Sequence, residues 1–254
     1  MIGLLLSVVW YCAAAAFVVA LIALVRPARR LGMSTRRRAT VIMAIALAVF
    51  VLLSIVPPPV TRVAARMSEL DEVAPTYHYA ERHSRYINAS PERVYNATKT
   101  VSAEEIRLFR TFTWIRRFGQ PGPESILNAP EHLPLLDVAL QSGFVLLSDR
   151  PPREIVFGAI VVAPPIARGK GRVTPDLYRT ISAPGFVKAT MNFRIDPDGT
   201  GSRITTETRV HGTDTDAILR FTPYWRTILP GSWILRVTWL DAIRRRAEGL
   251  ELKN

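Results

Sequence analysis

The chain has 254 residues, enough for one good core with additional elements, and its formal net charge is +12. That charge is uneven: residues 1–66 contain eight arginines and no acidic residue, so the other 188 residues contribute only +4. A nucleic-acid-binding protein would carry its basic residues on the folded domain, so we expect no nucleic-acid partner. The single cysteine, Cys12, excludes an intrachain disulfide and does not decide the redox compartment.

Two apolar segments near the N-terminus are long enough to cross a lipid bilayer. Residues 2–25 form 24 uncharged residues, about 36 Å of helix, and residues 39–56 would span about 27 Å. A cleaved signal peptide is the weaker interpretation, because no positive residues precede the first segment. Three consecutive prolines end the second segment. We therefore expect a two-helix transmembrane anchor over residues 1–58 and a juxtamembrane linker over residues 59–75.

The connector between the two segments, residues 26–38, predicts the orientation of the anchor. It contains six arginines. The positive-inside rule places such a connector in the cytoplasm, so the N-terminus and everything after residue 56 would lie outside the plasma membrane. The linker sequence over residues 60–70 predicts a short helix with one apolar face, either on the membrane surface or as an ordinary solvated helix. That face would carry Val60, Val63, Ala64, Met67 and Leu70.

The rest of the chain, residues 76–254, begins with a strand followed by helices. Residues 77–88 are rich in aromatic side chains and predict the first strand. Ser90 can cap a helix that starts at Pro91 and runs to about Lys99. A capping-box pattern at residues 102–105 predicts a second helix.

The middle of this region alternates loops with short elements. Residues 118–134 are rich in Gly and Pro and predict a loop, followed by a helical turn over residues 135–140. Strands are expected over residues 144–148 and 154–162. The basic segment 163–175 predicts a mobile loop near anionic lipid head groups, and its Gly169 and Gly171 lack the spacing of a phosphate loop.

Two alternating segments, residues 185–195 and 203–211, give the clearest strand signal. The turn between them contains Gly199 and Gly201, which suits a β-hairpin. We expect one face of the hairpin to point inward, against the last helix. That face carries Met191, Phe193, Ile195, Ile204, Thr206, Thr208 and Val210.

The other face of the hairpin carries a possible polar cluster of Asn192, Arg194, Glu207 and Arg209. The favoured interpretation is a solvent-facing ladder of charges, each pair contributing little stability. The alternative is a buried cluster that orients a ligand or acts as an acid and a base.

Residues 213–249 show helical apolar spacing and predict a long C-terminal helix. Asp214 or Asp216 can cap its start and Gly249 its end. The Pro230-Gly231 pair is expected to kink or break it. The predicted fold class is therefore α+β: a transmembrane helical hairpin followed by a curved antiparallel sheet that grips one long helix.

Two stretches resemble a known superfamily. The strand-to-helix passage reads Arg85-Tyr86-Ile87-Asn88-Ala89-Ser90-Pro91-Glu92-Arg93-Val94-Tyr95, and the hairpin contains Met191-Asn192-Phe193 and Thr206-Glu207-Thr208-Arg209-Val210. Together with the Trp-containing final helix, they resemble the START-like, polyketide cyclase/dehydrase (SRPBCC) superfamily over about residues 76–249. The resemblance implies a helix-grip domain, a curved antiparallel sheet around the long C-terminal helix, with a hydrophobic cavity between the sheet and that helix. Its lining residues would be Met191, Phe193, Thr206, Thr208, Phe221, Trp225 and Ile228.

The residues themselves do not identify a catalytic group, a cofactor or a protein partner. The four histidines, His78, His83, His132 and His211, show no metal-ligand spacing, so we predict no metal site. The leading hypothesis is a membrane-anchored module that binds a lipid-like or other hydrophobic small molecule at the outer face of the plasma membrane. The alternatives are a cyclase- or hydratase-type enzyme acting on an apolar substrate, and an assembly subunit of a membrane complex without a ligand.

Overall fold

The computed structural model describes residues 2–26, 32, 34–56, 58–167 and 172–250. The chain forms two compact units. One comprises Met1–Pro59 together with Ile218–Arg226, and the other comprises Val60–Ala217 together with Thr227–Asn254.

The first unit contains the helices α1 (Ile2–Val25) and α2 (Arg36–Ile55). Both are long and apolar enough to cross a membrane. They pack through small side chains, since Ala20, Ala23 and Ala39 are buried between them, while leucines, isoleucines and valines on their other faces are exposed. Residues 27–31 and 33 of the arginine-rich connector lie outside the described residues, and its predicted cytoplasmic location stays a prediction.

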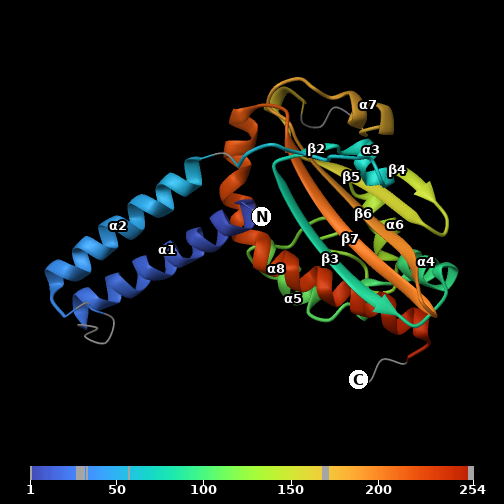
Figure 1. Cartoon of the computed structure of the whole chain (residues 1–254), viewed down its shortest axis with the longest axis horizontal. Helices are drawn as coiled ribbons and strands as arrows, with labels where there is room; N and C mark the ends of the chain where they lie inside the picture. Colours follow the sequence, from blue (N-terminus) through green and yellow to red (C-terminus); the bar gives the residue numbers. More distant parts are fainter. Residues whose placement is uncertain (1, 27–31, 33, 57, 168–171, 251–254) are drawn as a thin grey trace. The chain divides into compact units, whose positions relative to one another are not determined.

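A five-stranded antiparallel sheet forms the frame of the second unit (Figure 1), with strand order β3-β7-β6-β5-β4. The predicted hairpin is confirmed in β6 and β7, and the other predicted strands are present. The strands are β3 (Tyr79–Ile87), β4 (Phe144–Arg150), β5 (Glu154–Val162), β6 (Val187–Asp198) and β7 (Gly201–Gly212).

The long helix α8 (Thr215–Glu248) confirms the predicted C-terminal element, including both of its caps. The Asp214 side chain accepts a hydrogen bond from the Ala217 amide, and Gly249 ends the helix with a φ of 70°. Of the kink or break expected at Pro230-Gly231, the break is wrong, because the helix continues through both residues. A proline removes only one backbone hydrogen bond, and the Phe112 ring packs against the helix at Gly231.

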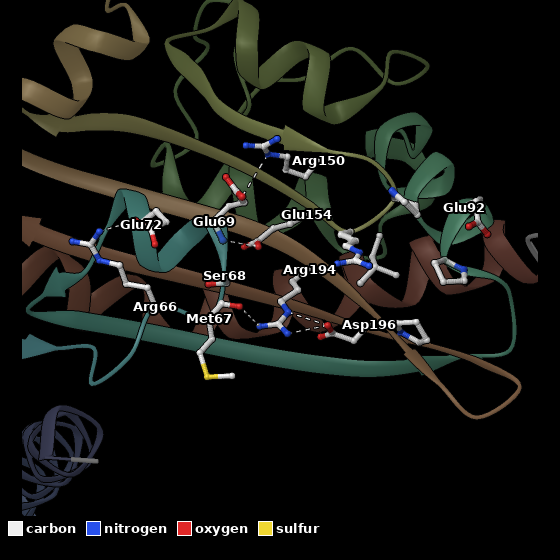
Figure 2. Close-up of a pocket in the computed structure, with 15 residues that line it drawn as sticks. Arg66, Met67, Ser68, Glu69, Glu72, Glu92, Arg150, Glu154, Arg194 and Asp196 are labelled. Carbon is white, nitrogen blue, oxygen red and sulfur yellow. Dashed lines mark hydrogen bonds and ion pairs between the residues drawn. The ribbon is translucent and has the colours of Figure 1, made fainter.

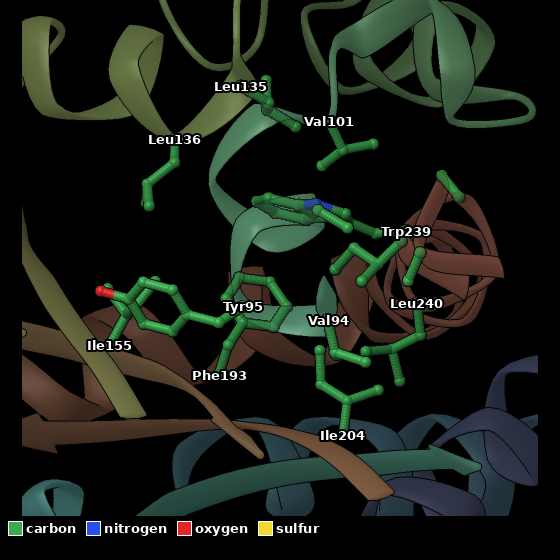
Figure 3. Packing of buried hydrophobic residues seen from close by; sticks show 14 of the residues in the cluster. Val94, Tyr95, Val101, Leu135, Leu136, Ile155, Phe193, Ile204, Trp239 and Leu240 are labelled. Atoms are coloured by element: carbon green, nitrogen blue, oxygen red, sulfur yellow. The ribbon is translucent and has the colours of Figure 1, made fainter. Parts of the chain in front are cut away.

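One face of the sheet, called here the inner face, packs against the C-terminal part of α8 and against α4 (Pro91–Thr100) and α6 (Leu135–Gln141) (Figure 3). Ser90 caps α4 as expected. The Phe193 and Trp239 rings meet edge to face with centroids 5.0 Å apart, which joins the middle of the sheet to α8.

The second predicted helix is shorter than expected and interrupted. The capping box of Ser102 and Glu105 is present, but it opens only a short 3₁₀ turn, η2 (Ala103–Glu105). The helix α5 (Phe109–Arg116) starts separately after Leu108, whose φ is 62°. This left-handed residue turns the chain, and both Ile106 and Phe109 are buried in the main core as a result.

The opposite, outer face of the sheet is covered by short elements. The helix predicted over residues 60–70 is wrong, because this stretch forms β1 (Thr61–Arg62), paired with β2 (Thr76–Tyr77), and the start of α3 (Glu69–Val73). The sequence signals also missed α7 (Pro175–Thr180) and the turn η3 (Pro165–Ala167). A second apolar cluster holds this layer on the sheet: Leu70, Ala74, Val145, Leu147, Val156 and Tyr178.

Candidate functional site

Polar side chains gather on both faces of the sheet, in two groups with different properties. The outer cluster consists of Asp71, Glu154, Asn192, Glu207 and Arg209. The inner cluster lies between β3, β7 and α8 and consists of Glu81, His83, Thr206, Ser232, Arg236 and Trp239.

Arg209 is the centre of the outer cluster. Its guanidinium donates to Asp71 at 2.7 Å, to Glu207 at 2.6 Å and to the Ala74 carbonyl at 3.0 Å. It also lies over the Tyr77 ring, 4.9 Å from the centroid. Burial lowers the pKa of Arg209, but its hydrogen bonds to Glu207 and Asp71 outweigh burial and raise it overall. The ion is therefore fully paired.

Asn192 extends the outer cluster toward α3. Its amide donates to Glu154 at 2.6 Å, and its carbonyl accepts from the Glu207 amide at 2.9 Å. Glu154 accepts in turn from the backbone amides of Glu69 at 2.9 Å and Leu70 at 3.3 Å. The expectation of a solvent-facing ladder is therefore wrong for Asn192, Glu207 and Arg209. The physical reason is that α3 and the segment before it cover this face, which hairpin alternation cannot reveal.

An open pocket of about 940 Å³ adjoins the outer cluster (Figure 2). Arg194, the fourth residue of the predicted polar cluster, lies here and pairs with Asp196 at 2.9 Å. Arg66 pairs with Glu72 at 2.7 Å and Arg150 with Glu69 at 3.5 Å. Since these charges already neutralise one another at an exposed surface, the pocket offers little net charge to a ligand.

The inner cluster begins with two residues of β3. Glu81 and His83 are two positions apart, so both point to the inner face of the sheet. The His83 Nε2 lies 2.8 Å from a Glu81 carboxylate oxygen. The Ser232 hydroxyl of α8 donates to the other oxygen at 2.7 Å. Glu81 is only 8% exposed, so this is a buried carboxylate between an imidazole and a hydroxyl.

Three further members of the inner cluster have a buried polar atom that lacks a hydrogen-bond partner among the described residues: Thr206 Oγ1, Arg236 Nη1 and Trp239 Nε1. Thr206 pairs across the sheet with both His83 and Phe193. The Trp239 ring contacts Phe193, and the Arg236 guanidinium lies 5.8 Å from the Trp239 ring centre. The three atoms therefore belong to one region between β7 and α8.

Arg236 is the cation of this region; its side chain is half-buried, and its Nη1 atom is fully buried. The pKa of Arg236 is lowered to about 10, mainly by burial. The nearby Glu81 carboxylate raises this pKa, and the Arg116 cation lowers it further. The guanidinium stays charged at neutral pH even so. An arginine in this environment favours an anionic or strongly polar partner.

The residues predicted to line a cavity fall into three groups. Met191, Phe193, Thr206 and Thr208 are buried on the inner face, where Met191 and Phe193 pack into the main core. Ile228 is half-buried on α8. Phe221 and Trp225 are buried in the segment Ile218–Arg226, which belongs to the other unit, so the structure does not join them to this site.

The sequence reasoning missed Glu81, His83, Ser232 and Arg236. A signal was present, because Tyr79, Glu81 and His83 alternate on a strand whose inward side must be buried. Metal-ligand spacing, the criterion applied to the histidines, does not reveal such a pair. Among the described residues the structure shows no group of three or more His, Cys, Asp or Glu that could hold a metal ion.

No family model and no curated protein sequence matches the chain. Solved structures that align with this chain include TTHA0849 from Thermus thermophilus, with a TM-score of 0.28 and 14% identity over 67% of this chain and 98% of that one. Protein MLL2253 from Mesorhizobium loti has a TM-score of 0.32 and 11% identity over 68% of this chain and 100% of that one. CalU16 from Micromonospora echinospora has a TM-score of 0.24 and 14% identity over 67% of this chain and 84% of that one. Similarity at this level assigns neither a family nor a function.

Proposed function

We propose that this chain is a membrane-anchored helix-grip domain that binds a hydrophobic small molecule with a hydrogen-bond acceptor at its polar end. The observation that carries the proposal is the set of three unpartnered buried polar atoms on Thr206, Arg236 and Trp239. A buried polar atom without a partner costs about 1–3 kcal/mol. Three in one region indicate that a partner is supplied by another molecule.

The chemistry of these atoms restricts what that molecule can be. The guanidinium of Arg236 and the indole of Trp239 only donate hydrogen bonds, and the Thr206 hydroxyl can donate as well. The complementary group is therefore an acceptor, and beside a guanidinium a carboxylate makes the strongest hydrogen bonds. The half-buried Ile228 of α8 would contact the apolar body of such a molecule.

The two apolar helices α1 and α2 would supply the anchor, with the domain on the outer face of the plasma membrane. Their length and composition suit a bilayer. The six arginines of the connector favour its retention in the cytoplasm. A domain tethered in this way would take an amphipathic molecule from the bilayer or return one to it.

Binding can be measured with the full chain in detergent, using a fluorescent fatty acid and its matched fatty alcohol. We expect the acid to bind at least several-fold more tightly, because its carboxylate meets the Arg236 cation. Arg236→Met should remove this preference for the acid. Arg194→Met should leave it unchanged, because Arg194 lies on the outer face of the sheet, away from the inner cluster. A wild-type chain that binds neither probe, or binds both equally, contradicts the proposal.

The inner cluster also favours an enzyme as a second candidate function. The buried Glu81 carboxylate 2.8 Å from the His83 imidazole is an acid–base pair of the kind that a cyclase or hydratase requires. In that case the mass or structure of a molecule co-purified with Glu81→Gln should differ from that found with the wild type. Identical bound molecules in both would remove this candidate.

A further inference from the structure

The helix α5 exposes apolar side chains on the side that faces away from the core. Phe109 and Thr113 are buried, and Phe112 packs against α8, within 3.3 Å of the position that a Cβ on Gly231 would occupy. The opposite side carries residues at helical spacing that are at least half exposed. They are Leu108 at 55%, Trp114 at 57%, Ile115 at 53% and Phe118 at 89% exposure. These four residues are called the α5 patch.

The local backbone holds the two aromatic residues of the α5 patch in place. Gly119 has a φ of +71°, and the position that its Cβ would occupy lies 3.0 Å from the Trp114 ring. A larger residue there would push the indole aside. The glycine therefore leaves room for the Trp114 ring at the C-terminal end of α5, while Phe118 at that end has a φ of 53°. Exposed apolar side chains gathered in this way mark an interaction site.

The chain segment that carries the α5 patch is basic, although Glu131, from another segment, pairs with one of its arginines. Residues 106–123 contain four arginines and no acidic residue. Arg110 is tied to Glu131 at 2.6 Å, while Arg107 is exposed. Arginines beside exposed tryptophan and aliphatic side chains match the interface of an anionic bilayer, where the rings sit among the head groups and the cations meet lipid phosphates.

We propose that the α5 patch inserts into the head-group region of an anionic phospholipid bilayer. The inference relies on the anchoring by α1 and α2 proposed above, which keeps the domain close to lipid. It is independent of the inner cluster and of any ligand bound there. A short helix inserted this way would add a second, reversible contact with the membrane to the permanent one.

The test uses the full chain in vesicles. Cys12→Ser removes the native thiol, and Ile115→Cys carries a polarity-sensitive fluorophore. Vesicles of phosphatidylcholine mixed with phosphatidylglycerol are compared with phosphatidylcholine alone, each with and without brominated lipid as a quencher. A matched control places the same probe at Leu177→Cys on α7, where the native side chain is 48% exposed.

We expect a blue-shifted probe at position 115, quenched several-fold more strongly than the probe at position 177, and more strongly in anionic vesicles. Adding Arg107→Gln and Arg110→Gln should weaken the effect of anionic lipid. If the chain floats with the vesicles while both probes report equally polar surroundings, the insertion of the α5 patch is overturned and the anchoring by α1 and α2 is not. A chain that does not float overturns the anchoring as well. If the surroundings of the probe at position 115 become apolar in detergent as the protein concentration rises, a second copy of the chain covers the α5 patch. That result also overturns the proposed insertion.

Discussion

At the scale of single residues, the arginine of the outer cluster and the arginine of the inner cluster differ in how their hydrogen-bond donors are paired. Arg209 has three hydrogen-bond partners and an aromatic ring, so its charge is compensated inside the protein. Arg236 has an unpartnered nitrogen in a buried position. An arginine whose donors are paired stabilises one conformation, whereas the unpartnered nitrogen of Arg236 can donate a hydrogen bond to a ligand.

Arg209→Met should strongly destabilise the domain, by about 3–5 kcal/mol, because Asp71 and Glu207 would stay buried without their cation. The matched control is Arg194→Met, which breaks a half-exposed pair with Asp196 and should cost less than about 1 kcal/mol. Chemical unfolding of the full chain in detergent measures both. Equal effects of the two substitutions would show that the outer cluster contributes no special stability.

His78 makes the domain sensitive to acid. Burial, and then the neighbouring His211, lower the pKa of His78 from 6.5 to about 4, and its Nδ1 accepts a hydrogen bond from the Gly212 amide at 3.2 Å. Burial and Lys188 lower the pKa of His211 as well. The folded state thus favours neutral imidazoles. Their contribution to stability is complete when the pH is above the pKa of histidine in the unfolded chain, and it is lost as the pH falls toward the lower pKa in the folded chain. We expect a lower melting temperature at mildly acidic pH than at neutral pH.

His78→Gln should flatten this pH dependence, because the substituted side chain no longer takes up a proton on unfolding. Thermal unfolding of both proteins across the mildly acidic range measures the difference. A pH profile in the variant as steep as that of the wild type would assign the acid sensitivity to other groups.

At the scale of elements, the β6–β7 hairpin illustrates how backbone packing selects glycine. A Cβ on Gly201 would overlap the Ile87 carbonyl of β3, whereas a Cβ on Gly199 would meet nothing within 4 Å. Gly199 is required only for its φ of 59°. The two glycines of one turn therefore have different physical roles.

Gly201→Ala should cost about 3 kcal/mol, since the backbone of β3 must move away. Gly199→Ala should cost about 1 kcal/mol, the strain of a left-handed alanine. The free energies of unfolding of the two variants, compared in one set of conditions, test the pairing of β3 with β7. A more damaging substitution at Gly199 than at Gly201 would be inconsistent with this strand arrangement.

At the scale of the whole molecule, an anchored sheet domain requires that the chain stay in the membrane under alkaline extraction. Alkaline phosphatase, which folds only outside the cytoplasm, should be active when fused after residue 250 and inactive when inserted into the connector between α1 and α2. A fluorescent reporter at the C-terminus that works only in the cytoplasm would reverse the proposed orientation. Release of the chain by alkali would refute the anchor itself.

Local signals in the sequence were sufficient for most elements of the fold. Apolar periodicity and length predicted α1, α2, α8 and the β6–β7 hairpin, and the caps at Ser90, Asp214 and Gly249 were all correct. The errors fell where long-range contacts overrule local preference. Pro230 stays within a helix, and residues 60–70 form β1 and part of α3 on the outer face of the sheet.

The sequence by itself determined which segments are apolar, which alternate and where helices begin and end, because these properties depend on neighbours within a few residues. Only the tertiary structure decided which side of the sheet would be covered by α3. It also decided that Glu81 of β3 would meet Ser232 of α8, although 151 positions separate them in the chain. Burial and pairing of charge depend on which distant segments meet, and a one-dimensional pattern does not contain that information.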